Sequence, residues 1–279
     1  MAEPFVGSEA IARGLVTKSQ LYTRYTRLFR DVYIDRDAEV SAAVRARAAW
    51  LWAGPRAVVA GFSASAMHGS LWVDGTRAAE LIHHNRHPVP GIVVHSDAVS
   101  EDETTTIAGI PLTTPARTAL DLACWYPTMT AVAGIDALAR EAEIKAADIE
   151  SLTSRYVGRR GITRARRLAD LVDAGSQSPK ESWLRMVLIE AGLPKPQTQI
   201  PVLDEFNCPI AYLDMGWEDI KVAVEYDGEQ HRSDRRQYIR DIRRLETAER
   251  RGWIVIRVVA GDRPAEIIRR VRAALARRL

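Results

Sequence analysis

Acidic side chains and one histidine are concentrated between Asp214 and His231. Apolar and polar residues alternate along the segment 220–227, which predicts a strand with one core face and one face that carries Glu225 and Asp227. Strand interiors are depleted in Asp and Glu, so two carboxylates on one face need a cationic neighbour or water. A metal ion, a nearby lysine or arginine, or solvent could each meet that need.

Asp214 and Glu225 are the candidate metal ligands. A second strand over 210–215 and a turn at 217–219 predict an antiparallel hairpin that sets the two acids side by side. Mg²⁺, or Mn²⁺ in its place, takes one or two carboxylates and keeps several waters, which leaves positions for a phosphate oxygen. The metal would lower the pKa of an attacking water, and His231 could transfer protons or bind the phosphate. The residues fit phosphodiester hydrolysis, and a solvated acidic hairpin is the alternative.

Further elements are expected on both sides of the hairpin. Ser178 and Pro179 open a helix that Gly192 ends, and Glu181 lies in its first turn, where an acid interacts favourably with the helix dipole. After the hairpin, the spacing predicts a helix over 233–251 and a buried strand over 253–259. The expected order is helix, hairpin, helix, strand.

Five separated segments in this order resemble the very-short-patch-repair (Vsr)-like branch of the PD-(D/E)XK nucleases, across residues 176–279. They are Glu181, the strand ending at Asp214, the Val-Glu-Tyr-Asp-Gly-x-x-His run of 224–231, Asp241-x-x-Arg244-Leu245, and Gly252-Trp253-x-Val255-x-Arg257. The resemblance implies an α/β nuclease core, Mg²⁺ dependence and DNA as substrate, with Asp214 and Glu225 as metal ligands. It implies supporting catalytic roles for Glu181, Asp227, His231 and Asp241. Asp227 holds the position of the usual lysine, which leaves the water-activating group unassigned.

Arginines form two clusters that could contact phosphates. The segment 155–167 contains six arginines and no acid, and the expected helix 233–251 with the residue before it is also rich in arginine. Stripes of this kind favour phosphate backbones, and ordinary solvated helix faces are the alternative. The candidate DNA contacts beside the hairpin are Arg232, Arg235 and Arg244.

The N-terminal segment has the pattern of a winged helix-turn-helix. Ser8 is expected to cap a helix through Arg13, and Thr17 to cap a second helix over 18–25. Residues 27–34 are compatible with the β-ribbon of a wing, and a small capping helix pair is the alternative. The polar residues that would face DNA from the second helix and the ribbon are Lys18, Ser19, Gln20, Thr23, Arg24, Arg27 and Arg30.

Residues of the first 125 positions are similar to the AbiEi-type antitoxins of bacterial type IV toxin–antitoxin systems. The similarity lies in Gly14-Leu15 with Leu28-x-x-Asp31-Val32-Tyr33, in Ala64-x-Ala66-x-His68-Gly69, and in the run Thr113 to Ala123. It implies operator DNA binding by the winged helix, autoregulation of a toxin operon and a cognate toxin protein as partner. It does not imply catalysis.

The middle region has mostly structural patterns. A helix is expected over 57–71, and strands over 79–84, 91–96 and 107–112. Two further helices are expected over 131–140 and around 146–156. Four histidines lie in this region without the cysteines or acids that would complete a zinc site: His83, His84, His87 and His95.

Composition bounds the class of protein. The chain has 279 residues, 47% of them hydrophobic, a net charge of +3 and two cysteines. It contains no apolar run of about 18 residues and no signal-peptide pattern, so we expect a cytoplasmic protein that does not bind membranes. We predict an α/β protein, α+β overall, with a winged helix-turn-helix at 1–40, a mixed α/β region at 41–175 and a PD-(D/E)XK nuclease-like core at 176–279.

Two functions are open at this stage. The chain could be a two-domain DNA enzyme, in which the winged helix selects the site and the C-terminal core cuts it with Mg²⁺. It could instead be a regulator or antitoxin without catalytic activity. Convergent carboxylates at Asp214 and Glu225 would favour the enzyme, and a buried arginine ion pair between them would favour the regulator.

Overall fold

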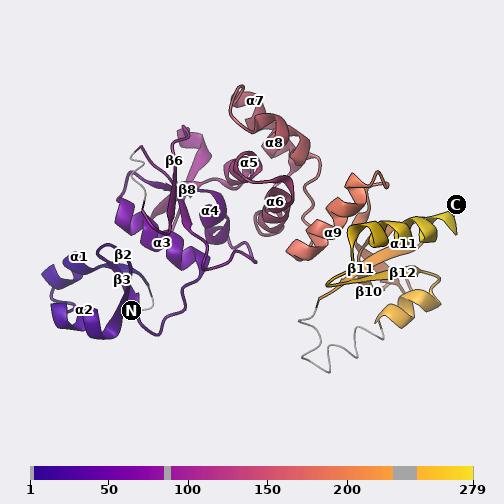
Figure 1. The fold of residues 1–279 in the computed structure, drawn as a ribbon, viewed down its shortest axis with the longest axis horizontal. Coiled ribbons are helices and arrows are strands. Elements are labelled where there is room, and N and C mark those ends of the chain that lie inside the picture. The colour runs from indigo at the N-terminus through magenta and orange to yellow at the C-terminus, as the bar shows by residue number, and fades with distance from the viewer. Residues whose placement is uncertain (1–2, 85–88, 229–243, 279) are drawn as a thin grey trace. The chain divides into compact units, whose positions relative to one another are not determined.

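The computed structural model describes residues 3–84, 89–228 and 244–278. The chain divides into two compact units, Met1–Val172 and Asp173–Leu279. The described residues form helices and three sheets, which confirms the expected α+β class (Figure 1). The finer division at residues 40 and 175 stays a prediction. No helix in the described ranges is both long and apolar enough to cross a membrane.

The chain begins with two short helices followed by a β-ribbon. The elements are β1 (Phe5–Val6), α1 (Gly7–Ala12), α2 (Lys18–Arg24), β2 (Tyr25–Phe29) and β3 (Val32–Asp35). The strands form an antiparallel sheet of order β1-β3-β2, and α3 (Ala42–Ala53) packs against all three. Ala10, Val16 and Leu21 form the small core beneath the helices. This arrangement is a helix pair with a wing, as the sequence predicts.

Two capping predictions have different outcomes. Thr17 caps α2 as expected, through a capping box in which its side chain accepts a hydrogen bond from the Gln20 amide. The prediction for Ser8 was wrong, because α1 begins at Gly7 with Val6 as its N-cap. The Ser8 hydroxyl instead donates to Oδ2 of Asp31 (2.5 Å). Asp31 lies in the turn of the ribbon. The Ser8 side chain therefore bonds to a residue distant in sequence and does not cap the helix.

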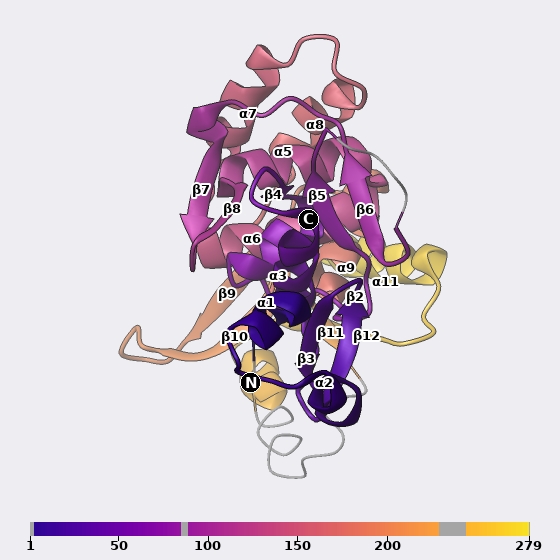
Figure 2. The ribbon, with the colours of Figure 1, turned by 90° about the vertical axis from the view of Figure 1, so that its left-hand side faces the viewer.

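A five-stranded sheet of order β6-β5-β4-β8-β7 forms the centre of the first unit. Its strands are β4 (Val58–Val59), β5 (Ala79–Ile82), β6 (Ile92–His95), β7 (Thr104–Ile107) and β8 (Ile110–Thr113). Around it lie α4 (Gly61–Met67), α5 (Pro115–Trp125), α6 (Thr128–Ala142), α7 (Ala146–Arg155) and α8 (Ile162–Ala169). Figure 2 shows α5 to α8 with the strands of this sheet from a second side.

The expected helix over 57–71 was wrong in its first turn. Val58 and Val59 instead form β4, which pairs with β5 and β8, and the Val59 side chain is part of the core of this sheet. The helix α4 starts at Gly61, whose φ of 55° favours glycine. A Cβ at Gly61 would lie 2.2 Å from a carboxylate oxygen of Glu80. That carboxylate accepts a hydrogen bond from the Phe62 amide in the first turn of the helix.

The second unit is a four-stranded sheet between helices. It contains α9 (Pro179–Glu190), β9 (Gln197–Leu203), β10 (Pro209–Trp217), β11 (Val222–Asp227), β12 (Ile254–Val259) and α11 (Pro264–Ala276). The order is β12-β11-β10-β9, with antiparallel pairs except between β11 and β12, which are parallel. Parallel neighbours need a crossover, and the described part of this crossover is helical over 244–250.

Both faces of this sheet are covered. On one face, Val222 and Val224 pack with residues of α9 and α11. On the other, Ala223 packs with Ala248 of the crossover helix and with Trp253. The crossover helix therefore lies over the face that carries Glu225, and the alternative of a solvated acidic face does not hold for this residue. The Glu225 side chain therefore lies in the protein interior.

Candidate functional site

The hairpin of β10 and β11 brings Asp214 and Glu225 together. Its register pairs Met215 with Val224. One residue further along each strand, Asp214 and Glu225 lie opposite each other. The backbone amide of Asp214 donates to Oε1 of Glu225 (2.8 Å). The amide of Tyr226 donates to Oδ2 of Asp214 (2.8 Å). The predicted antiparallel hairpin and the adjacency of its acids are both confirmed.

Glu225 is a buried acid with an unusual pKa. Its surface is 4% exposed, and the removal of water raises its pKa to about 8. The nearby Asp214 carboxylate raises this pKa too, whereas Arg244 lowers it. Nη2 of Arg244 lies 2.5 Å from Oε2 of Glu225, in an ion pair whose arginine side chain is 28% exposed. Buried carboxyls with shifted pKa values occur often at functional sites and also in structural ion pairs.

Arg244 thus has a role that the sequence did not predict. It was expected to contact DNA, and in the structure it also donates to the carbonyl of Tyr212. These bonds hold the start of the described crossover helix against β10 and β11. The pattern Asp241-x-x-Arg244 marks this arginine in the sequence, but it says nothing of which acid the arginine meets.

The supporting acids lie in different surroundings. The Glu181 carboxylate accepts from the Gln177 amide (2.8 Å) and the Ser178 hydroxyl (2.9 Å) at the start of α9. Asp227 forms an ion pair with Arg257 of β12 (2.6 Å). Among the described residues, no three His, Cys, Asp or Glu side chains gather closely enough to hold a metal ion. Four predicted site residues lie outside the described ranges: His231, Arg232, Arg235 and Asp241.

The predicted DNA contacts of the first unit lie on α2 and on the β-ribbon. Six of them are exposed: Lys18, Ser19, Thr23, Arg24, Arg27 and Arg30. Gln20 is half-buried, and its side-chain oxygen accepts the Thr17 amide (2.7 Å) as part of the capping box. The exposed set carries four positive charges on adjacent elements, which suits a phosphate backbone.

Comparison with known proteins gives one family match and two relatives. The family described as the AbiEi antitoxin C-terminal domain matches residues 57–173. Proteins from two strains of Mycobacterium tuberculosis, both named only as uncharacterized, are 30% identical over 175 residues. The alignment covers 63% of this chain and 64% of each relative, which is less than two thirds of their length. No solved structure matches.

The family match supports the antitoxin resemblance predicted from the sequence. The matched segment includes the central sheet and the helices α4 to α8. No nuclease is among these matches, and the resemblance of residues 176–279 to Vsr-like nucleases stays a prediction.

Proposed function

We propose that this protein is a DNA-binding regulator of the antitoxin type, which acts with a cognate toxin protein. The observation that carries the proposal is the match of residues 57–173 to the AbiEi antitoxin C-terminal domain. A helix pair with a wing lies N-terminal to the matched segment, and α3 connects the two. DNA is the partner of the helix pair, and the toxin is the partner implied by the family resemblance.

The proposed DNA contact places α2 in the major groove. Helix-turn-helix proteins read base edges from the N-terminal part of their second helix. Lys18 and Ser19 lie there and are exposed, while Leu21 packs into the small core and fixes which face of α2 turns outward. Arg27 and Arg30 of the ribbon then reach the neighbouring backbone.

Salt-dependent binding tests this contact. The full chain would be titrated against a labelled duplex taken from upstream of its own coding region, at several salt concentrations. A Lys18→Gln, Arg24→Gln variant should bind more weakly, with a salt slope reduced by about 1 for each lost phosphate contact. The exposed Arg13 at the end of α1 supplies the control, Arg13→Gln. An unchanged slope in the double variant would count against the contact.

The toxin partner has a separate test. The product of the neighbouring gene would be expressed with and without this chain, and growth would be followed. Restored growth that is lost in the Lys18→Gln, Arg24→Gln variant would mean protection through DNA binding. Growth that stays inhibited in both cases would remove the neighbouring product as the cognate toxin.

A Mg²⁺-dependent endonuclease is the second candidate, and the adjacency of Asp214 and Glu225 on facing strands favours it. Carboxylate oxygens from two adjacent strands suit a hard divalent cation. In this arrangement, however, the guanidinium of Arg244 holds one oxygen of Glu225. A cation would have to displace Arg244 from that oxygen, so the residues as arranged do not fit a bound metal and we derive no catalytic step.

Cleavage assays decide between the two candidates. The full chain would be incubated with Mg²⁺ or Mn²⁺ and duplex, mismatched or single-stranded DNA. If the core is a nuclease, the Asp214→Ala, Glu225→Ala variant should lose cleavage while it keeps DNA binding through the winged helix. Equal products from the variant and the parent would remove the enzymatic hypothesis.

A further inference from the structure

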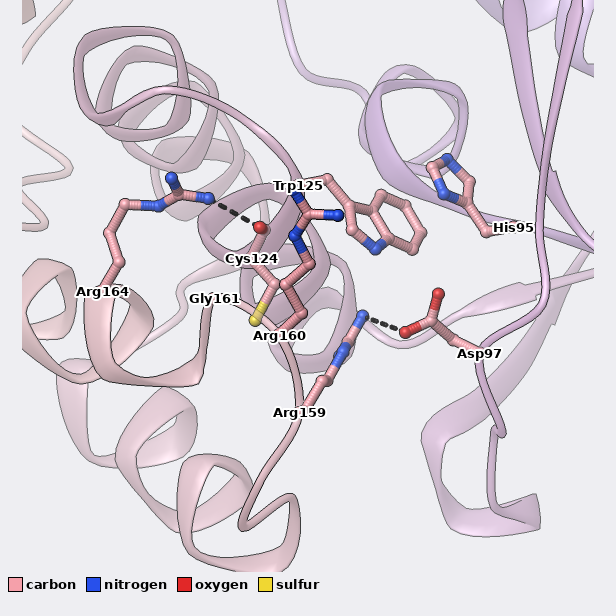
Figure 3. Close-up of a pocket in the computed structure, with 8 residues that line it drawn as sticks. All are labelled: His95, Asp97, Cys124, Trp125, Arg159, Arg160, Gly161 and Arg164. Atoms are coloured by element: carbon pink, nitrogen blue, oxygen red, sulfur yellow. Dashed lines mark hydrogen bonds and ion pairs between the residues drawn. The ribbon is translucent and has the colours of Figure 1, made fainter.

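A cavity of about 650 Å³ lies in the first unit, where the end of α5 meets the start of α8 and the segment after β6 (Figure 3). Three arginines line it, Arg159, Arg160 and Arg164, together with one acid, Asp97, and the indole of Trp125. Small-molecule sites span roughly 300 to 1,000 Å³. The cavity is therefore large enough for an organic molecule.

The charge of the lining is positive. Nη2 of Arg159 lies 2.9 Å from Asp97 and 2.7 Å from Asp121, so this arginine is already neutralised by acids. Within the described ranges, neither Arg160 nor Arg164 forms an ion pair, and Arg160 is exposed. Two guanidinium charges therefore lie at the cavity without an acid of their own, which favours an anionic ligand.

Arg164 is held in place by main-chain acceptors. Its Nε donates to the carbonyl of Ala123 (2.9 Å) and its Nη2 to the carbonyl of Cys124 (2.6 Å), as Figure 3 shows for the second bond. Carbonyls orient a guanidinium but do not cancel its charge. A planar arginine fixed in this way is suited to the recognition of a phosphate or carboxylate.

Arg159 supplies an independent indication of a ligand. Its side chain is 10% exposed, and its buried Nη1 has no hydrogen-bond partner among the described residues. A buried donor without an acceptor is costly. An anion in the cavity would bring an acceptor to this wall.

Trp125 gives the cavity a rigid flat wall. Its ring stacks on His95, with the ring centroids 3.4 Å apart and the planes 1° from parallel. Nε2 of His95 lies 3.3 Å from the buried carboxylate of Glu80, which fixes the imidazole in turn. An apolar or aromatic body can pack beside such a ring at little entropic cost.

We propose that this cavity binds a small organic phosphate, with its phosphate group between Arg160 and Arg164 and its organic body beside Trp125. The two arginines without an acid of their own favour phosphate, whose oxygens can accept hydrogen bonds from both guanidinium groups. The site lies inside the segment that matches the antitoxin family and is separate from α2 and the β-ribbon. Ligand binding there is a function additional to DNA binding.

Isothermal titration of the full chain tests the proposal with four probes: adenosine monophosphate, ribose 5-phosphate, adenosine and inorganic phosphate. At least one of the two organic phosphates should bind. The affinities of adenosine and inorganic phosphate should be lower by about tenfold or more. Arg160→Gln should weaken the organic phosphate about tenfold. Among the described residues, Arg160 forms no hydrogen bond or ion pair and its side chain is exposed, so this variant should remain folded.

The matched control is Arg167→Gln. Arg167 is exposed on α8, the helix that follows Arg160, and is not among the residues that line the cavity, so its removal takes away the same charge and should leave the affinity unchanged. Equal weakening by both variants would mean long-range attraction only and would overturn the proposal. So would binding of adenosine as tight as that of its phosphate, or the absence of Arg160-dependent binding of both organic phosphates at millimolar concentration. Preferential, Arg160-dependent binding of a hexaglutamate peptide would overturn it in favour of an acidic protein segment.

Discussion

The amide of Asp214 donates to the carboxylate of Glu225 (2.8 Å), and the amide of Tyr226 donates to the carboxylate of Asp214 (2.8 Å). Each acid therefore accepts a backbone amide from the opposite strand. The pair stabilises the open end of the β10–β11 hairpin whether or not it also binds a cation. Any loss of activity in variants of these acids must for this reason be read beside a measurement of hairpin stability.

The raised pKa of Glu225 predicts a pH-dependent hairpin. Between its ordinary value of 4.5 and about 8, the folded chain holds a proton that the unfolded chain releases. The contribution of Glu225 to the free energy of unfolding is fully present below pH 4.5 and is lost as the pH rises through about 8. Hydrogen exchange of residues 209–227 should therefore quicken as the pH rises, after correction for intrinsic rates. Glu225→Gln should remove that component, and an identical pH response in the variant would contradict it.

The Thr17 cap should support both the stability of α2 and DNA binding. Thr17→Ala removes the acceptor for the Gln20 amide and should destabilise the helix pair by about 1 kcal/mol. DNA affinity should fall with it, because α2 carries the proposed contacts. Thr17→Ser keeps the hydroxyl and should behave as the parent in thermal unfolding and in DNA titration. Parent-like behaviour of Thr17→Ala would show that the cap does not matter to either.

Arg117 should be the most sensitive charge of the first unit. It is fully buried, with Nε 2.8 Å from Asp121 and Nη1 bonded to Glu103. Arg117→Met leaves two buried carboxylates short of a partner and should destabilise the unit by about 3–5 kcal/mol in denaturant unfolding. Arg13 makes the control, since its ion pair with Glu9 is exposed and involves neither of these buried acids. Arg13→Met should change the free energy of unfolding far less than Arg117→Met, and equal effects would contradict the assignment.

Gly216 should be required for the hairpin. A Cβ there would lie 2.2 Å from the carbonyl oxygen of Val222 on the facing strand. Gly216→Ala should therefore push β10 and β11 apart and raise amide exchange at Asp214 and Tyr226, at a cost of about 1–3 kcal/mol. Gly192 has a φ of 74° but open space at its Cβ, so Gly192→Ala reports backbone strain alone. Faster exchange at Asp214 in both variants would attribute the effect to general destabilisation.

The two cysteines should differ in reactivity. Cys124 is buried, and burial raises the pKa of its thiol, which lowers the fraction of reactive thiolate. Cys208 is exposed near the β9–β10 turn. Iodoacetamide should label Cys208 first in the folded chain, and both residues should react at similar rates in denaturant. Early labelling of Cys124 in mass spectrometry would contradict its burial.

Several features of this protein follow from short stretches of sequence. The alternation over 220–227 and the turn before it predict the hairpin, because side-chain period and turn chemistry are local properties. Thr17 and Gln20 predict the start of α2 in the same way, since a capping box needs only residues three positions apart. The adjacency of Asp214 and Glu225 follows once the hairpin forms in this register.

Tertiary contacts decided the rest. Val58 and Val59 belong to a strand and not to a helix because β5 and β8 lie beside them. Arg244 meets Glu225 because the crossover helix covers the charged face of the strand, whereas alternation alone left open whether a metal, an arginine or water would lie there. The arginine cavity joins side chains from β6 to α8, far apart in sequence. Burial, ion pairing and pKa depend on such distant neighbours, so the sequence predicted which residues could do chemistry and only the fold determined which of them meet.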